Sequence, residues 1–329
     1  MTMNQAAVAA AVGVPETRWR DREKYRQRYN ASPGSCVAVL RPVEDRGDAA
    51  AAPDELASAQ AEEPRGVEKE LHTMRWGLVR HYTPADAKPD FFRAFNARSD
   101  TLPEKPMFNS LLGRKRCVVL LSAFYEFKPE GSAPVIKQPY LVKAADGGLL
   151  LAAGLYDRWV SDTEGELYTC TILTKDAPPA TRWLHDRLPV FLSAEEADMW
   201  LDVGCTDVSP ERLLQRISSP EAGVELAWHP VSTRVNKGNV DDPACMTPTK
   251  REVERNAGSI ATLFANAGSP LKRKGADCAE LASPEAKVQH LGAGHTHSAQ
   301  KQKQTPQGKG MRSLTTFFGT PPADKKALN

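Results

Sequence analysis

Three separate groups of polar residues in this sequence could carry acid–base chemistry. Glu126 stands between two aromatic residues near the end of the apolar run 118–127 (VVLLSAFYEF), where a buried strand is predicted. A carboxyl group held among apolar side chains has a raised pKa that suits proton transfer, whereas one that ends in solvent does not. The other two groups contain His185, within WLHDRLP, and Asn96, within FNARSD. Each group alone is weak evidence, because such residues more often have structural roles.

Arginines and aromatic residues accompany these groups. Arg98 and Arg187 follow Asn96 and His185, respectively, by two residues. Three aromatic residues and two arginines fall within 91–100, where they could form a platform for unpaired bases or pack in the core with exposed guanidinium groups. The basic and aromatic segment 18–29 has the same two interpretations, and its charge pattern favours a solvated segment.

The elements that must position these residues are mostly strands. Strands are predicted at 36–40, 118–127, 139–143, 149–159, 167–174 and 228–232. Short helices are predicted at 4–14, after the N-cap Ser193 with Glu196 in a capping box, and after Ser209. Many strands, few short helices and no regular alternation of strand and helix indicate an α+β fold that is mostly antiparallel and barrel-like.

Composition divides the chain into a body and a tail. From Thr247 onward there are 13 Lys/Arg and 6 Asp/Glu, so the tail is basic although the whole chain has a net charge of only +2. Residues 249–329 contain few apolar residues and are predicted to be disordered, as is an Ala-, Glu- and Pro-rich insertion at 44–70. The six cysteines form no CxxC pair or metal-ligand spacing, which indicates a reduced intracellular protein without a metal. No apolar run reaches membrane-spanning length, so no membrane association is expected.

Six motifs occur in a characteristic order along the body: YNASP, MRWGL, FNARSD, CVVLLSAFYEF, LHDRLPV and HPVSTRVN. This order closely resembles the SOS-response-associated peptidase (SRAP) family, from about Tyr29 to about Pro248. In that family a cysteine at position 2, exposed by self-removal of the initiator Met, closes on the ring-opened aldehyde of an abasic site as a thiazolidine. The resemblance implies a barrel-like SRAP domain over 1–248. It also implies a nuclear, monomeric protein without cofactors that crosslinks to abasic sites in single-stranded DNA and so shields them during replication.

The resemblance also assigns roles residue by residue. Glu126 would assist Met removal and the proton transfers of ring opening and imine formation. His185 would shuttle protons in crosslink formation and reversal, and Asn96 would position the N-terminal group and the lesion. The residues implied in DNA contacts are Arg98 and Arg187 for backbone phosphates, and Trp76 and Phe92 for stacking at the junction of single and double strands.

The start of the chain departs from the family pattern Met-Cys-Gly-Arg. It reads Met1-Thr2-Met3-Asn4, and the first cysteine is Cys36. The YNASP motif also lies nearer the start than in the family, so the first strand of the domain is expected to be missing. An incorrect start codon or a lost exon would explain this. The alternative is a genuine loss, which leaves a relative that binds single-stranded or junction DNA without crosslinking.

These departures limit the chemistry expected of the chain as given. Without a thiol at position 2 no thiazolidine is expected, so the peptidase and crosslinking or lyase-like activities of the family stay uncertain here. The hydroxyl of Thr2 could form only a weaker oxazolidine-like adduct, because a hydroxyl is a poor nucleophile. A smaller departure is Arg80, which stands shortly after MRWGL where a proline is usual.

The tail contains a motif that resembles the PCNA-interacting box, SLTTFF at 313–318. Leu314, Phe317 and Phe318 would occupy one side of a helical turn and fill a hydrophobic pocket of the replication clamp. Met311 stands where the box normally has Gln. A chance cluster in a disordered tail is the alternative, and it is the favoured interpretation for the similar sequence at 260–264.

Overall fold

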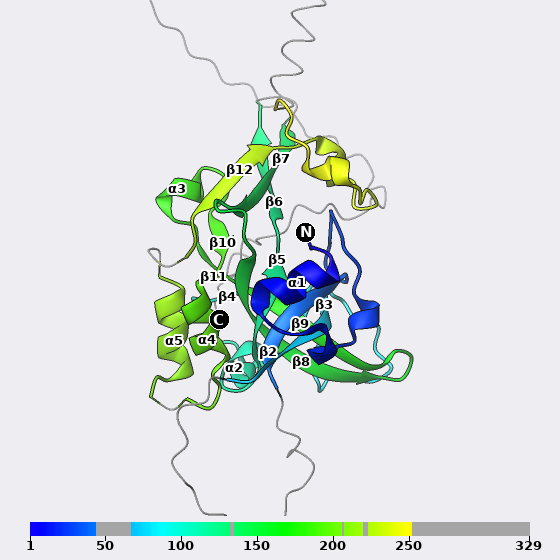
Figure 1. Cartoon of the computed structure of the whole chain (residues 1–329), viewed down its shortest axis with the longest axis vertical. Helices are drawn as coiled ribbons and strands as arrows, with labels where there is room; N and C mark the ends of the chain where they lie inside the picture. The colour runs from blue at the N-terminus through cyan, green and yellow to red at the C-terminus, as the bar shows by residue number, and fades with distance from the viewer. Residues whose placement is uncertain (44–66, 132–134, 206, 220–222, 252–329) are drawn as a thin grey trace, which may run out of the picture. The chain divides into compact units, whose positions relative to one another are not determined.

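Five strands close on themselves into a barrel-like sheet in the computed structural model (Figure 1). These strands are β2 (Cys36–Pro42), β3 (Lys69–Trp76), β5 (Arg116–Leu121), β8 (Leu150–Ser161) and β9 (Gly165–Asp176). They pair in the order β3-β2-β5-β8-β9, and all these pairs are antiparallel. The ring is completed by a short parallel pairing of β3 with β9, which joins Trp76 to Cys170. The structure describes residues 1–43, 67–131, 135–205, 207–219 and 223–251.

Shorter strands extend the barrel, and a second sheet adjoins it. The short strands are β1 (Trp19–Arg20), β4 (Asn96–Arg98), β10 (Arg187–Pro189) and β11 (Phe191–Leu192). The second sheet contains β6 (Phe124–Glu130), β7 (Ile136–Ala144) and β12 (Leu226–Pro230), in the order β12-β7-β6. Both β4 and β10 pair with β9. This strand therefore brings the segment that contains Asn96 close to the segment that contains His185. The expected α+β, mostly antiparallel and barrel-like fold is confirmed.

The helices are short, and three of them have side-chain N-caps. They are α1 (Gln5–Val12), α2 (Pro106–Leu112), α3 (Pro179–Arg182), α4 (Ala194–Leu201) and α5 (Pro210–Ile217). The Asn4 side chain caps α1, Ser193 and Glu196 form the predicted capping box of α4, and Ser209 caps α5. Helices α2 and α3 were not predicted from the sequence. Single 3₁₀ turns lie at Glu16–Arg18, Arg22–Lys24, Thr233–Asn236 and Pro243–Met246. In the described part of the chain, no helix is long and apolar enough to cross a membrane.

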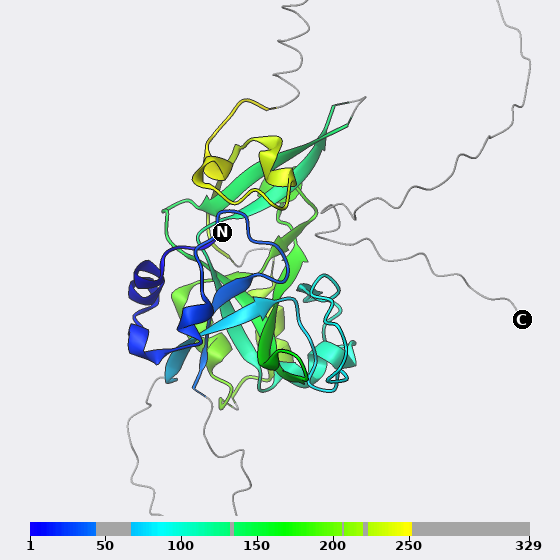
Figure 2. The ribbon, with the colours of Figure 1, turned by 90° about the vertical axis from the view of Figure 1, so that its right-hand side faces the viewer.

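The run 118–127 is not the single strand that the sequence suggested. It contains the end of β5 and the start of β6, which belong to different sheets. The strand is interrupted at Ser122 and Ala123, where Met1 packs between the two sheets. The Ser122 N–H donates to the Met1 carbonyl over 3.2 Å, and the Met1 amino group donates to the Ala123 carbonyl over 2.8 Å. In both ribbon views the N-terminus accordingly lies where the two sheets meet (Figures 1 and 2).

Two other expectations concern the predicted insertion at 44–70 and the tail. Strand β3 begins at Lys69, so residues 69 and 70 belong to the barrel rather than to the predicted insertion. Residues 44–66 of that insertion lie outside the described residues, as does almost all of the tail. The clamp-binding residues proposed from the sequence, Leu314, Phe317 and Phe318, also lie outside them.

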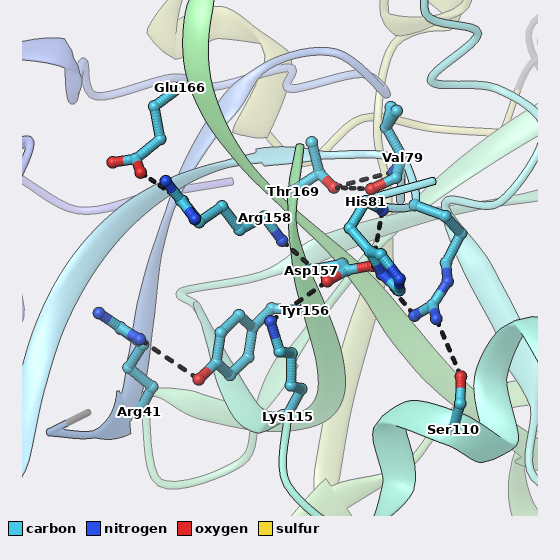
Figure 3. Close-up of polar contacts among 11 residues, drawn as sticks. Arg41, Val79, His81, Ser110, Lys115, Tyr156, Asp157, Arg158, Glu166 and Thr169 are labelled. Carbon is cyan, nitrogen blue, oxygen red and sulfur yellow. Dashed lines mark hydrogen bonds and ion pairs between the residues drawn. The ribbon is translucent and has the colours of Figure 1, made fainter. Parts of the chain in front are cut away.

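A buried carboxylate, Asp157, connects the segment after β3 to β8 (Figure 3). Its oxygens lie 3.1 Å from the Arg80 guanidinium, 3.3 Å from the Lys115 ammonium and 3.0 Å from the His81 ring. Burial alone would raise the pKa of Asp157, but hydrogen bonds from His81 and the nearby cations hold it below its usual value. The arginine that replaces the usual proline is therefore used as one of the counter-ions of this carboxylate.

Candidate active site

Glu126 is held in an apolar environment by the pairing of β6 with β7. It lies opposite Tyr140 in the register, and its side chain is only 4% exposed. Burial raises the pKa of Glu126 to about 8, although the Phe127 N–H donates to its Oε1 over 3.0 Å and acts in the other direction. Glu126 is therefore a carboxylic acid at neutral pH and can donate a proton, as the sequence analysis expected of a buried carboxyl group.

His185 and Arg187 line the same cleft as Glu126. The Arg187 backbone N–H donates to His185 Nδ1 over 2.9 Å, which places the proton of the neutral ring on Nε2. Burial lowers the pKa of His185, so the ring is neutral near pH 7 and can accept a proton. A carboxylate oxygen of Asp186 also lies 2.9 Å from Nδ1 and favours the charged ring. The Asp186 side chain is 78% exposed, however, so solvent weakens this effect.

The two predicted phosphate ligands are joined through one carboxylate. Asp100 accepts from Arg98 Nε over 3.2 Å and from its terminal nitrogen over 2.7 Å, and it also lies 3.2 Å from the Arg187 guanidinium. Arg187 is nearly buried and also pairs with Asp176. The strands β4 and β10 thus bring Arg98 and Arg187 together around Asp100, and Arg187 also lines the cleft.

Asn96 and Trp76 line a neighbouring, mostly apolar pocket together with the first two residues of the chain. Phe124 lines both this pocket and the cleft of Glu126 and His185. Met1 is 7% exposed, and burial lowers the pKa of its α-amino group to about 5. At neutral pH this group is an uncharged amine, which is the nucleophilic form.

The family of this chain follows from its sequence as a whole. A sequence model described as "SOS response associated peptidase (SRAP)" matches residues 1–238. This chain belongs to the SRAP family. Among its relatives, the protein named "Abasic site processing protein HMCES" from Xenopus tropicalis is 34% identical over 69% of this chain and 68% of its own length. The protein of the same name from Gallus gallus is 32% identical over 78% of this chain and 79% of its own length.

Relatives are also found in microorganisms and among solved structures. The "Abasic site processing protein YMR114C" of Saccharomyces cerevisiae is 31% identical over 69% of this chain and 54% of its own length. A crystal structure of a protein from Bacteroides thetaiotaomicron is similar with a TM-score of 0.47 and 27% identity, and covers 55% of this chain and 77% of that one.

The SRAP motif MRWGL is fixed in place by a close backbone approach. Gly77 has φ +121°, and a Cβ atom built there would lie 2.3 Å from the Phe91 carbonyl oxygen. Only glycine fits this position. The preceding Trp76 donates its indole N–H to the Phe95 carbonyl over 2.9 Å, which fixes the ring at the wall of the pocket.

The structure gathers most, but not all, of the residues predicted from the SRAP motifs. Glu126, His185 and Arg187 share the cleft, and Asn96 and Trp76 share the adjoining pocket. Phe92 lines neither; its side chain is 57% exposed. Among the described residues, no group of three or more His, Cys, Asp or Glu could hold a metal ion.

The sequence indicated Thr2 only through the family pattern, and it did not indicate the two tryptophans that also lie at the site. Thr2 lies at the pocket, held by a hydrogen bond from the Arg28 N–H to its hydroxyl over 2.8 Å and by its own N–H to the Arg28 carbonyl over 3.0 Å. Only the family pattern at position 2 pointed to it. Trp183 and Trp228 line the cleft. Two tryptophans 45 residues apart in the sequence give no signal that they lie side by side.

Proposed function

We propose that this protein recognises abasic sites in single-stranded DNA and reacts with them through its α-amino group. The observation that carries the proposal is the juxtaposition of a proton donor, a proton acceptor and an uncharged amine. Glu126 and His185 line one cleft, and Met1 lines the adjoining pocket with Asn96. The SRAP relatives named as abasic site processing proteins support this choice of lesion.

The residues present suit the formation of an imine. The amine nitrogen attacks C1′ of the open-chain deoxyribose aldehyde, and the resulting carbinolamine loses its hydroxyl as water. Glu126, protonated at neutral pH, supplies the proton that leaves with this hydroxyl. His185 accepts the proton that the nitrogen releases, and the product is a C=N bond between the protein and the sugar.

Phosphate recognition in this proposal is independent of sequence. Arg98 and Arg187 bind backbone phosphates once these replace the carboxylates of Asp100 and Asp176. A lesion sensor requires contacts of this kind, because an abasic site has no base to be read. Such contacts also make binding weaken as salt increases.

Borohydride trapping tests the proposal. An imine is reduced by sodium borohydride to a stable amine, so the protein and an oligonucleotide with a natural abasic site should give a covalent band that requires the reductant. The Glu126→Gln variant should slow its appearance by about 10²- to 10⁴-fold, the usual contribution of a general acid. Exposed Glu104 provides the matched control, and Glu104→Gln should leave the rate unchanged.

A second candidate is a SRAP protein that binds the lesion without covalent chemistry. Thr2 stands at the position of the family cysteine, and its hydroxyl cannot replace a thiol in ring closure. Binding of the abasic oligonucleotide without any trapped band would establish this candidate. A heat-stable adduct without borohydride would contradict both, and absence of binding would refute the whole assignment.

We also propose that the protein is nuclear and that its tail attaches it to the replication clamp. A peptide spanning 309–319 should bind PCNA in calorimetry, and Leu314→Ala with Phe318→Ala should abolish the heat. No heat at about tens of micromolar, the range of weak peptide ligands, would count against a clamp ligand.

A further inference from the structure

Two tryptophans with partly exposed indole rings lie beside the cleft of Glu126 and His185. Trp183 directly follows α3, and Trp228 lies in β12, which is next to α3 in Figure 1. Their exposed fractions are 39% and 38%, and both line this cleft. Adjacent exposed rings at the edge of a polar site are typical of an interaction surface rather than of a core.

The strand register places Trp228 on the same face of the second sheet as Glu126. Trp228 lies opposite Val142, which in turn lies opposite Phe124, two residues before Glu126. Directly opposed residues, and residues two apart on a strand, project from the same face. Two strand spacings, or about 10 Å, separate Trp228 from β6, and both Trp228 and Glu126 line the same cleft.

The two rings are held in place without a ligand. Their centroids are 5.8 Å apart with the planes tilted by 54°. The buried Tyr140 packs edge-on against Trp183 at 5.3 Å and is itself fixed by a 2.9 Å hydrogen bond from its hydroxyl to Glu130. A base that stacks here therefore meets preorganised rings and costs little side-chain entropy.

A cation accompanies the rings. The Lys128 ammonium lies 4.6 Å from the ring centroid of Trp183. Lys128 follows Glu126 by two residues on β6, so it projects from the same face of the sheet. Aromatic faces combined with a nearby cation match the chemistry of an unpaired nucleotide, whose base stacks while its phosphate takes the charge.

We propose that Trp183 and Trp228 form a stacking site for an unpaired base next to the abasic nucleotide, with Lys128 on the adjoining phosphate. This subsite rests on the proposed function, since the lesion must occupy the cleft of Glu126 for its neighbour to reach the rings. The site accepts any base, because every base presents a π-face. The bound strand then runs from the cleft across β7 towards β12.

Fluorescence anisotropy with two oligothymidine probes tests the subsite on the full-length protein. One probe carries a single tetrahydrofuran abasic analogue, and the other carries three in succession, so that the flanking bases are missing. The wild-type protein should bind the triple analogue about 5- to 100-fold more weakly than the single one, which corresponds to the loss of one stacked base. Equal affinities for the two probes would overturn the subsite without any variant.

Variants then locate the lost contact. Trp228→Ala should weaken binding of the single analogue by a similar factor and abolish the difference between the probes, whereas Trp228→Phe should restore much of it. Tyr82→Ala, which removes an exposed ring that lines neither the cleft nor the pocket, should change nothing. If Trp228→Ala bound both probes as the wild type does, the rings would only pack β12 against α3. Failure of the wild type to bind either probe would refute the proposed function and the subsite together.

Discussion

Replacing Glu126 by Gln should make the protein more stable at alkaline pH and leave it unchanged at acidic pH. The pKa of Glu126 is about 8 in the fold against 4.5 in an unfolded chain. Between these values the folded state holds a proton that the unfolded state releases, so the contribution of Glu126 is complete below about pH 4.5 and is lost as the pH rises through 8. Gln keeps the shape of the protonated acid but never ionises.

The size of the effect follows from the same two pKa values. Their difference corresponds to about 5 kcal/mol, which is an upper bound because local opening of the fold would hydrate the carboxylate. The difference in unfolding free energy between Glu126→Gln and the wild type should therefore be near zero at pH 4.5 and reach several kcal/mol at pH 9. The wild-type profile alone would obscure this, since the Met1 amine, with its pKa lowered to about 5, stabilises the fold increasingly from pH 5 to 8.

Urea unfolding of both proteins at several pH values measures the difference. The exposed Glu104→Gln supplies the control and should show no trend with pH. A difference between Glu126→Gln and the wild type that is constant from pH 4.5 to 9 would refute the buried, protonated state of Glu126. It would also remove the proton donor from the proposed chemistry.

Three further predictions concern the stability of the fold and the rate of the proposed reaction. Asp157→Asn should lower the free energy of unfolding by about 3–5 kcal/mol in urea, because it leaves buried Arg80 without its counter-ion, whereas Glu164→Gln at the surface should change it by less than about 1 kcal/mol. Gly77→Ala should cost at least about 2 kcal/mol through positive φ and the clash with Phe91, and a thermal midpoint equal to the wild type would contradict the close approach. The rate of borohydride trapping should rise with pH near 5, where the amine loses its proton, and fall with pH near 8, where Glu126 loses its proton. A rate that does not change with pH would exclude these two groups.

The features that could be predicted from the sequence are those set by local chemistry. Ser193 and Ser209 were identified as the starts of helices because a cap depends on a few neighbouring residues. The aromatic neighbours of Glu126 in the sequence suggested two alternatives, a solvated side chain or a buried one with a raised pKa, and the structure supports the second. The roles proposed for Asn96 and His185 come from the family motifs, since neither residue type is informative alone.

The features that were missed depend on long-range contacts. The break between β5 and β6 is occupied by Met1, more than a hundred residues away in the chain. The pairing of Arg187 with Asp100 crosses from β10 to the end of β4, and no sequence pattern marks it. Helix α2 is short and largely apolar, so it lacks the polar face by which an amphipathic helix is recognised.

The parallel contact that closes the barrel has a kinetic consequence. Trp76 and Cys170 meet across 94 residues, whereas the antiparallel pairs β2–β3 and β8–β9 join strands that follow one another in the chain. Contacts of such sequence separation pay a large loop-closure entropy and form late in folding. Because Trp76 is both a closing residue and a wall of the pocket, the proposed lesion site forms only when the barrel is complete. Partly folded chains would then be unable to engage damaged DNA, and the fluorescence of Trp76 would report the last step of assembly.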